Sequence, residues 1–385
     1  MARNTTAGKG KAKAGAKWSG FKRFLTGAGI LLLLLMIPVG MAAWSWLKVQ
    51  RPYKGYEGAE KLVTVEPGMG ASQVLDLLQR EGVLADAKLA RPYLIYFMGD
   101  PRIQAGEYLF RGPLSTPEVL RKLAKGEVAT RSVTLIEGLT LEEAARQIAG
   151  KGFGREEVLL DLMRSPELIA DLDPEATDLE GYLFPETYSF SRGTSEREVV
   201  ATMVKTFRRL YERDVRPVLA RNPDGRTLRQ VVTLASIVEK EAQVPTERPL
   251  IAGVYRNRLQ RGIGLGADPT VIYALKRLGR WNGNIRRDDL RVDSPYNTYR
   301  YAGLPPGPIC SPGLASLEAA AAPADVPYLY FVSRNDGTHV FAETLAEHSR
   351  NVEQWQRRYW RERRARERRE REAQASGATG SPGRQ

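Results

Sequence analysis

The sequence predicts an α+β protein with an apolar segment near its N-terminus. Short runs rich in β-branched and aromatic residues alternate with stretches whose apolar residues recur every three or four positions, a pattern typical of strands between amphipathic helices. In addition, residues 24–47 contain no charged side chain. We therefore expect a basic tail (1–23), a transmembrane helix (24–47), a small α+β subdomain (58–150), a mixed α+β domain (151–350), and a charged helix with a disordered tail (351–385).

The apolar segment has the properties of a membrane anchor. Residues 24–47 are long enough to span a hydrocarbon core of about 30 Å. Trp44 and Trp46 stand near its end, where aromatic side chains favour the membrane interface. Residues 1–23 hold seven cations and no acid, so this end should stay in the cytoplasm and the rest of the chain should lie outside it. A cleaved signal peptide is the alternative, but the bulky Trp side chains argue against cleavage.

The charge distribution argues against nucleic acid as a partner. The chain has a net charge of +13, yet residues 24–349 hold 40 basic and 40 acidic side chains. The excess therefore sits at the two ends, and the body is neutral. With one cysteine, Cys310, and two histidines, the chain cannot build a multi-cysteine or histidine-rich metal site. We expect no metal and no other cofactor.

The small subdomain contains two similar strand–turn–helix units, one near its start and one near its end. Residues 61–65 form a strand-like run closed by Pro67 and Gly68, and a helical pattern follows. Residues 132–136 repeat this arrangement, and Thr140 begins a helix with the spacing of a capping box. This subdomain lacks a cluster of catalytic residue types. A binding or positioning role fits it best.

The larger domain combines helices with irregular, ordered segments. Residues 227–242 predict a long helix, and residues 179–188 predict a structured loop. Residues 268–313 are rich in Pro, Gly, Asn and Tyr, as expected of an active-site wall. Two strand-like runs at 328–332 and 339–341 flank Asn-Asp-Gly, which predicts a hairpin.

The long helix carries two candidate catalytic carboxylates, Glu239 and Glu241. On a helical wheel they lie on opposite flanks of one apolar face, so they should not act as a side-by-side pair. Glu241 stands over Ile237 and Val238, whereas Glu239 stands over Ala235 and Ser236. Apolar surroundings raise the pKa of a carboxyl, which suits a general acid near neutral pH. This favours Glu241, although two solvated glutamates would give the same sequence.

Several motifs that follow one another along the chain narrow the range of possible functions. They are ASIVEKE (235–241), GVYRNRL (253–259), DPTVIY (268–273), SPYNTY (294–299), GLPPGPI (303–309) and YLYFV (328–332), preceded by LEGYLFPETY (179–188). Their combination resembles the endolytic murein transglycosylases of the YceG-like family over residues 60–350. The resemblance implies a LysM-like fold for the small subdomain and a bacterial cell membrane as the location. Gly266 and Ala267 replace a polar pair usual in that family, which puts a sugar contact of its glutamine in doubt.

The resemblance also implies a reaction. Members cleave the β-1,4 bond between N-acetylmuramic acid and N-acetylglucosamine in peptidoglycan, without water, and leave a 1,6-anhydromuramyl end. The essential glutamate of the family matches Glu241, which would protonate the leaving oxygen and then accept the proton of the muramyl O6. Peptidoglycan glycan strands, the membrane and peptidoglycan synthases are the partners that follow from this resemblance.

Other residues are weaker candidates for substrate contact. They are Asp268, Tyr296, Asn297, Tyr299, Glu186 and Glu239. The aromatic members could stack on pyranose rings and the polar ones could orient sugar hydroxyls. The competing interpretation is loop packing for the two tyrosines and Asn297, and a role in holding the loop or turn for Asp268 and Glu186. For Glu239 it is a solvated position on the helix.

Two alternative functions remain open at this level. The first is a membrane-tethered, non-catalytic scaffold that binds glycan through the small subdomain. The second is an ordinary glycoside hydrolase, which needs a second carboxylate to supply a nucleophile or activate water. Glu239, Asp268 and Glu186 are the candidates for that second group.

Overall fold

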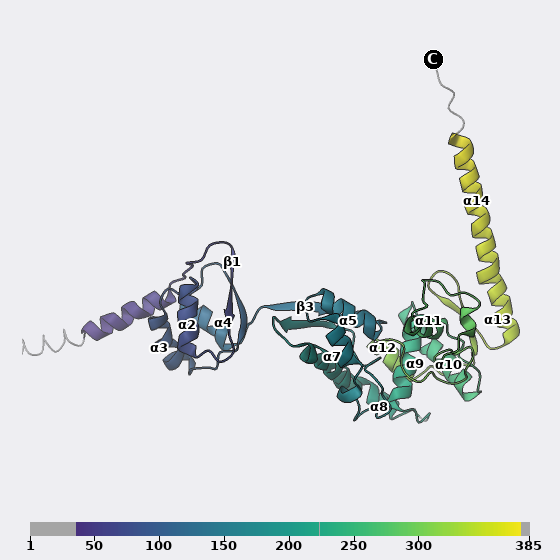
Figure 1. Ribbon diagram of the computed structural model, residues 1–385, viewed down its shortest axis with the longest axis horizontal. Coiled ribbons are helices and arrows are strands. Elements are labelled where there is room, and N and C mark those ends of the chain that lie inside the picture. The colour runs from purple at the N-terminus through teal and green to yellow at the C-terminus, as the bar shows by residue number, and fades with distance from the viewer. Residues whose placement is uncertain (1–35, 223, 379–385) are drawn as a thin grey trace, which may run out of the picture. The chain divides into compact units, whose positions relative to one another are not determined.

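The structure is a computed structural model that describes residues 36–222 and 224–378 (Figure 1). It contains two compact units. Unit 1 extends to Thr130 and includes Ser191–Gly193, and unit 2 comprises Arg131–Phe190 and the chain from Thr194 onward. Each unit has its own hydrophobic core.

The predicted transmembrane segment is described only in part. Residues 24–35 lie outside the described residues, and residues 36–47 belong to a helix that runs to residue 50. Over the ranges 36–222 and 224–378, no helix is both long enough and apolar enough to cross a bilayer. The membrane span therefore stays a prediction.

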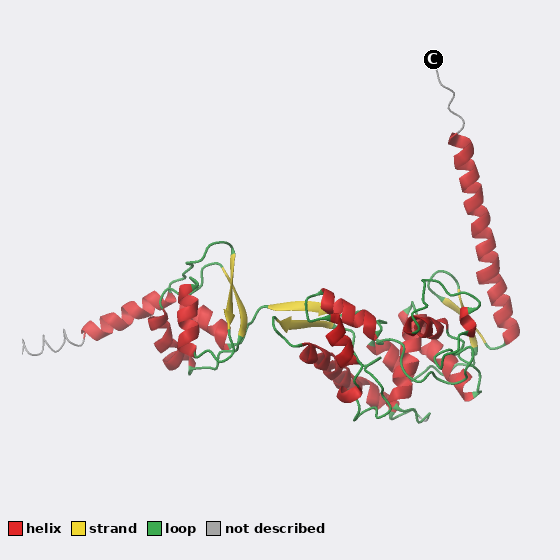
Figure 2. Ribbon diagram, viewed as in Figure 1, coloured by secondary structure: helices red, strands yellow, loops and turns green. Residues whose placement is uncertain are grey.

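Unit 1 consists of a two-stranded sheet, helix 36–50 and three further helices (Figure 2). Strand β1 (Glu60–Val65) pairs antiparallel with β2 (Gly106–Arg111), with Glu60 opposite Arg111. Alternate strand residues enter the core, because successive side chains point to opposite faces. The helices are α2 (Ala71–Arg80), α3 (Ala87–Met98) and α4 (Thr116–Ala124). The strand expected at 61–65 and the helix expected after it are confirmed as β1 and α2.

Helix α3 was not predicted from the sequence. It begins at the N-cap Asp86, whose carboxylate accepts hydrogen bonds from the backbone N–H groups of Lys88 at 3.0 Å and Leu89 at 3.3 Å. It ends at Gly99, which has a φ of 74°. Apolar residues surround most of this helix, so it lacks the one-sided periodicity on which the prediction depends.

The second strand–helix unit belongs to unit 2, because its apolar residues enter that core. Strand β3 (Thr130–Thr134) pairs with β4 (Thr187–Ser191), and Thr140 caps α5 (Leu141–Gly150) through a capping box. The structural division thus falls at residue 130 rather than at the expected boundary at 150. The predicted loop 179–188 runs into β4 at its last two residues.

Helices make up most of unit 2, as Figure 2 shows. They are α6 (Glu156–Met163), η1 (Pro166–Leu168), α7 (Glu196–Leu210), η2 (Tyr211–Val215), α8 (Arg216–Leu219), α9 (Leu228–Glu241), η3 (Pro245–Glu247), α10 (Arg248–Gln260), α11 (Asp268–Arg277), η4 (Asp289–Arg291), α12 (Leu314–Ala321), α13 (Leu345–Val352), η5 (Glu353–Arg358) and α14 (Tyr359–Ala378). Strands β5 (Tyr330–Ser333) and β6 (His339–Ala342) form the predicted antiparallel hairpin.

Helix α9 is the central element of unit 2. Its start is fixed by Thr227, whose hydroxyl accepts from the N–H of Gln230 at 3.3 Å while the Gln230 side chain accepts from the N–H of Thr227 at 3.0 Å. Such a cap is worth about 1 kcal/mol. Residues 231–238 are buried without interruption, and α10, α11 and α12 pack around them. Its last residue, Glu241, emerges from this core at the helix end.

A glycine brings the LEGYLFPETY segment against α9. Gly181 has a φ of 86°, and a Cβ atom there would lie 2.6 Å from Pro308 and 2.7 Å from Val232. A side chain at this position would collide with both neighbours. The absence of one lets residues 179–188 and the proline-rich 303–309 segment pack directly on the helix.

Candidate active site

Glu241 lines a cavity of about 790 Å³ in unit 2. Helix α10 contributes Tyr255 and Arg258, and the start of α11 contributes Asp268. The other lining residues come from two loops, from β5 and from α13 and η5: Gly264, Leu265, Gly266, Thr298, Tyr299, Phe331, Val332, His348, Val352 and Gln356. The cavity therefore has polar groups beside Glu241 and an apolar wall, a combination suited to a sugar ring.

The surroundings of Glu241 favour its protonated form. Desolvation of this half-buried side chain is the main cause that raises its pKa to about 7, and the negative charge of Asp268 adds to the effect. The hydroxyl of Tyr255 donates a hydrogen bond to Glu241 Oε1 at 3.2 Å, which opposes the rise. The C-terminal end of α9 also disfavours a carboxylate, because the helix dipole is negative there. Near neutral pH the group can thus both give and take a proton.

Asp268 and Tyr299 form one hydrogen-bonded pair in the same cavity. The Tyr299 hydroxyl donates to Asp268 Oδ1 at 2.6 Å. Next to them, the N–H of Ala267 donates to the Thr298 hydroxyl at 2.9 Å, which joins the start of α11 to the 298–299 loop. The structure therefore brings together three of the residues predicted from the sequence: Glu241, Asp268 and Tyr299.

Arg258 fixes the wall opposite the helix end. Its Nε–H donates to the carbonyl of Leu329 at 2.6 Å, and its Nη1 donates to the carbonyls of Gly264 at 3.2 Å and Leu265 at 2.8 Å. The guanidinium also lies 5.1 Å from the ring centre of Tyr330. One side chain of α10 thus holds the 264–266 loop and the start of the β5–β6 hairpin around the cavity.

Gly266 and Ala267 stand where the resemblance predicts a polar pair, and the backbone at Gly266 shows the local effect of this replacement. It lines the cavity with a φ of 56°, and its N–H donates to the carbonyl of Thr298 at 3.1 Å. Ala267 is buried in the core. Glycine adopts this backbone conformation without a steric penalty, and no side chain extends into the cavity at this position.

Glu239 points away from the cavity, in agreement with the helical wheel. Its Oε2 accepts hydrogen bonds from the N–H of Gly313 at 3.0 Å and the hydroxyl of Ser316 at 2.7 Å. Its Oε1 lies 3.3 Å from Arg248 Nη2. The side chain is 6% exposed. These partners tie α9 to α10 and α12, which is a structural arrangement.

Glu186 and Asn297 also lie outside the cavity lining. The carboxylate of Glu186 is 3.9 Å from Arg209, and half of the side chain is exposed. Asn297 is buried, and its Nδ2 donates to the carbonyls of Leu290 at 3.0 Å and Val292 at 2.8 Å. Its amide therefore stabilises the loop that presents Tyr299, and loop packing is the better interpretation for this residue.

Tyr296 packs against a different part of unit 2. Its ring centre lies 4.8 Å from that of Tyr273 and 5.4 Å from the guanidinium of Arg277. It is absent from the residues that line the Glu241 cavity. The structure thus separates Tyr296 from Tyr299, three residues later in the chain.

Sequence reasoning missed Tyr255, Phe331 and His348. Tyr255 is fully buried and its ring meets that of Phe331 edge-on at 5.8 Å. His348 stacks on Tyr330 at 5.1 Å, and burial together with the charge of Arg258 lowers its pKa. Tyr255 and Phe331 lie within motifs noted in the sequence, whereas His348 lies outside them. No signal along the chain, however, showed that they would meet Glu241.

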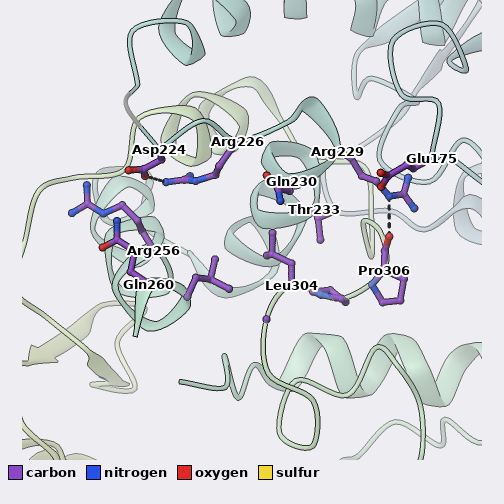
Figure 3. A pocket seen from close by; sticks show the side chains of 13 residues that line it. Glu175, Asp224, Arg226, Arg229, Gln230, Thr233, Arg256, Gln260, Leu304 and Pro306 are labelled. Atoms are coloured by element: carbon purple, nitrogen blue, oxygen red, sulfur yellow. Dashed lines mark hydrogen bonds and ion pairs between the residues drawn. The ribbon is translucent and has the colours of Figure 1, made fainter. Parts of the chain in front are cut away.

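A second cavity of about 580 Å³ is lined by several charged residues (Figure 3). Arg226 pairs with Asp224 and donates to the carbonyl of Ala320 at 2.6 Å. Arg229 donates to the carbonyl of Pro306 at 2.9 Å and pairs with the buried Asp173 at 2.8 Å. Because these two arginines are engaged in the fold, this cavity is a weaker candidate for chemistry than the one at Glu241.

Comparison with known proteins identifies the family. Residues 63–354 match the model of the YceG-like family. The chain belongs to the YceG-like family. The match covers both units and includes every residue named in the Glu241 cavity except Gln356.

Two bacterial proteins similar to this chain carry the name of an enzyme. The chain is 31% identical to an endolytic murein transglycosylase of Bacillus subtilis, over 76% of this chain and 84% of the relative. It is 29% identical to an endolytic murein transglycosylase of Streptococcus pneumoniae, over 77% of this chain and 59% of that longer relative. A crystal structure of a yceG-like protein from Listeria monocytogenes is 32% identical, with a TM-score of 0.51 over 76% of this chain and 99% of that one.

Proposed function

We propose that this protein is an endolytic murein transglycosylase that cleaves peptidoglycan glycan strands and uses Glu241 as its catalytic residue. The observation that carries the proposal is the position of Glu241 at the end of a buried helix, in a cavity large enough for sugar residues, where desolvation raises its pKa to about 7. The names of the Bacillus and Streptococcus relatives support the same reaction.

The proposed mechanism needs one carboxyl. Glu241 in its protonated form donates its proton to the oxygen between N-acetylmuramic acid and N-acetylglucosamine, and the bond from C1 of the muramyl sugar to that oxygen breaks. The O6 of the same muramyl sugar forms a new bond to C1. Its proton passes to the Glu241 carboxylate, which restores the acid. The product is a 1,6-anhydromuramyl end, and no water is consumed.

Asp268 and Tyr299 are proposed to bind the sugar rather than to act as nucleophiles. Their mutual hydrogen bond of 2.6 Å leaves the other oxygen of Asp268 to accept from a sugar hydroxyl. The negative charge of Asp268 also keeps Glu241 protonated. A hydrolase in which Asp268 activates water is the alternative, because this carboxylate shares the cavity. Glu239 and Glu186 do not line that cavity and are poorly placed for such a role.

The remaining parts of the proposal concern location and binding. We propose that residues 24–47 anchor the protein in the bacterial cell membrane, with the N-terminus in the cytoplasm and both units outside it. Unit 1 would serve as a LysM-like module that binds or positions the glycan strand. Peptidoglycan synthases are proposed partners, since they supply the strands that such an enzyme cuts.

The mass of the cleavage products tests the proposed reaction. Purified protein incubated with isolated peptidoglycan should release glycan fragments that end in 1,6-anhydromuramic acid. Each such fragment is lighter by one water molecule than the corresponding reducing fragment. Mass spectrometry, with a muramidase digest as a matched standard, distinguishes the two.

The same measurement separates the alternatives. Reducing ends of the heavier mass would support a hydrolase and contradict the single-carboxyl mechanism. Retained binding to peptidoglycan without any fragments, from protein that is folded by circular dichroism, would support the non-catalytic scaffold instead.

A further inference from the structure

Unit 1 exposes an aromatic surface on α3 and on helix 36–50. Tyr96 is 82% exposed and Phe97 is 64% exposed, on the last turn of α3. Trp44 is 60% exposed on helix 36–50. Isolated apolar residues on a surface are normal, but a continuous aromatic patch indicates an interaction site.

The patch is continuous because the two helices share an aromatic cluster. The ring centre of Trp46 lies 5.3 Å from that of Phe97 and 6.0 Å from that of Tyr93, and Tyr93 stacks on Phe97 at 5.0 Å. Between the helices runs an apolar groove of about 790 Å³, which Val39, Leu89 and Pro92 also line. Helix 36–50 and the exposed end of α3 therefore present one apolar face.

The chain outside the described residues indicates what covers this face. Helix 36–50 follows directly on residues 24–35, whose sequence has no charge and is mostly apolar. Tyrosine and tryptophan are the residues most enriched at the boundary between lipid chains and water. The apolar face thus lies at the C-terminal end of a segment with the composition of a membrane span.

Charges around the face fit an anionic membrane surface. Helix α3 contains no acidic residue, and the two acids beside it are neutralised: Asp86 pairs with Lys48 at 3.0 Å, and Asp100 pairs with Arg91 at 2.6 Å. Lys88 on α3 is exposed and forms no ion pair within the described part of the chain. An exposed cation on the same helix as the apolar face favours acidic lipid headgroups.

We infer that the C-terminal turn of α3, together with Trp44 and Trp46, inserts into the interfacial layer of a phospholipid bilayer. Unit 1 would then contact the membrane at a second place, in addition to the single helix that anchors the chain. This would fix the height of the glycan-positioning module above the bilayer. The inference concerns unit 1 alone and does not depend on Glu241.

The position of Tyr96 relative to lipid tests this inference. The full-length chain with Tyr96→Cys would carry a polarity-sensitive fluorophore, and Leu62→Cys would serve as the matched control. Leu62 is exposed on β1 in the same unit. The native Cys310 is fully buried, so labelling of folded protein should be confined to the introduced cysteine.

Both labelled proteins would be placed in vesicles of phosphatidylcholine and phosphatidylglycerol, with or without lipids that carry a quencher near the headgroup. Quenching at residue 96 should exceed quenching at residue 62 by at least about twofold, because an interfacial helix sits roughly 5–10 Å into the headgroup boundary. A blue shift of the emission should accompany it only at residue 96.

Three results would overturn the inference. Equal quenching at the two positions would show that the α3 face does not enter the bilayer. Failure of the wild-type chain to float with the vesicles would exclude a membrane contact altogether. Lipid-independent cross-linking of two Tyr96→Cys chains through their introduced thiols would show that a second copy covers the face.

Discussion

Replacing Glu241 by glutamine is expected to lower the rate of glycan cleavage by about 10²–10⁴-fold, the range typical of a lost general acid or base. Glutamine has nearly the same shape and can still accept the hydrogen bond from Tyr255, but it cannot donate a proton to the leaving oxygen. The measurement is the release of soluble glycan fragments from isolated peptidoglycan at equal protein concentration. Glu186→Gln is the matched control, because Glu186 is a half-exposed carboxylate outside the cavity and its replacement should leave the rate unchanged.

The pH dependence of the free energy of unfolding shows whether the Glu241→Gln variant is folded and whether the ionised Glu241 carboxylate destabilises the folded protein. The folded-state pKa of Glu241 is raised from 4.5 to about 7, so its stabilising contribution is present below pH 4.5 and is lost as the pH rises through 7. At pH 8 the glutamine variant should therefore be more stable than the wild type, by about 1–3 kcal/mol. Urea unfolding at pH 5 and pH 8 measures this difference. A variant that is less stable at both pH values would show that Glu241 has a structural role instead.

Replacing Glu239 by alanine is expected to lower the free energy of unfolding by about 3–5 kcal/mol, the range for breaking a buried ion pair from one side. The change leaves Arg248 with only the half-exposed Glu137, 3.8 Å away, as an acidic partner, and it removes the acceptor for the N–H of Gly313 and the hydroxyl of Ser316. The side chain of Arg248 is 12% exposed, so water cannot easily replace the carboxylate. Urea unfolding followed by circular dichroism measures the loss.

An exposed ion pair provides the control for this second prediction. Glu167 pairs with Arg197 at 3.0 Å, but both side chains are more than half exposed. Glu167→Ala should therefore change the free energy of unfolding by no more than about 1 kcal/mol. If Glu239→Ala abolished cleavage without reducing stability, Glu239 would belong to the chemistry and the assignment of Glu241 as the single carboxyl would be wrong.

Local sequence patterns were sufficient for several elements of the fold. The alternating pattern of β1, the capping box of α5 and the Asn-Asp-Gly turn between β5 and β6 are each encoded within a few residues. Helix α3 was missed because its apolar residues are not confined to one face. The pairing of β3 with β4 joins segments far apart in the chain, and no local pattern specifies such a partner.

The candidate site was predictable only where helical geometry or motif order was informative. The wheel separated Glu239 from Glu241, and the structure places them on different sides of α9. Residue type alone could not show that the amide of Asn297 would turn toward the backbone of its own loop. Nor could it show that Tyr255 would reach Glu241, because that contact depends on how α10 packs against α9.

Direct titration of the Glu241 carboxyl is the sharpest test of the account. Protein labelled with ¹³C at glutamate carboxyl carbons would be titrated by NMR, and the Glu241→Gln variant would assign the signal by its absence. We expect a midpoint near pH 7, because the carboxyl is poorly hydrated and faces the charge of Asp268. A midpoint near 4.5, the ordinary value, would mean that Glu241 is ionised at neutral pH and could not supply the proton on which the proposed cleavage depends.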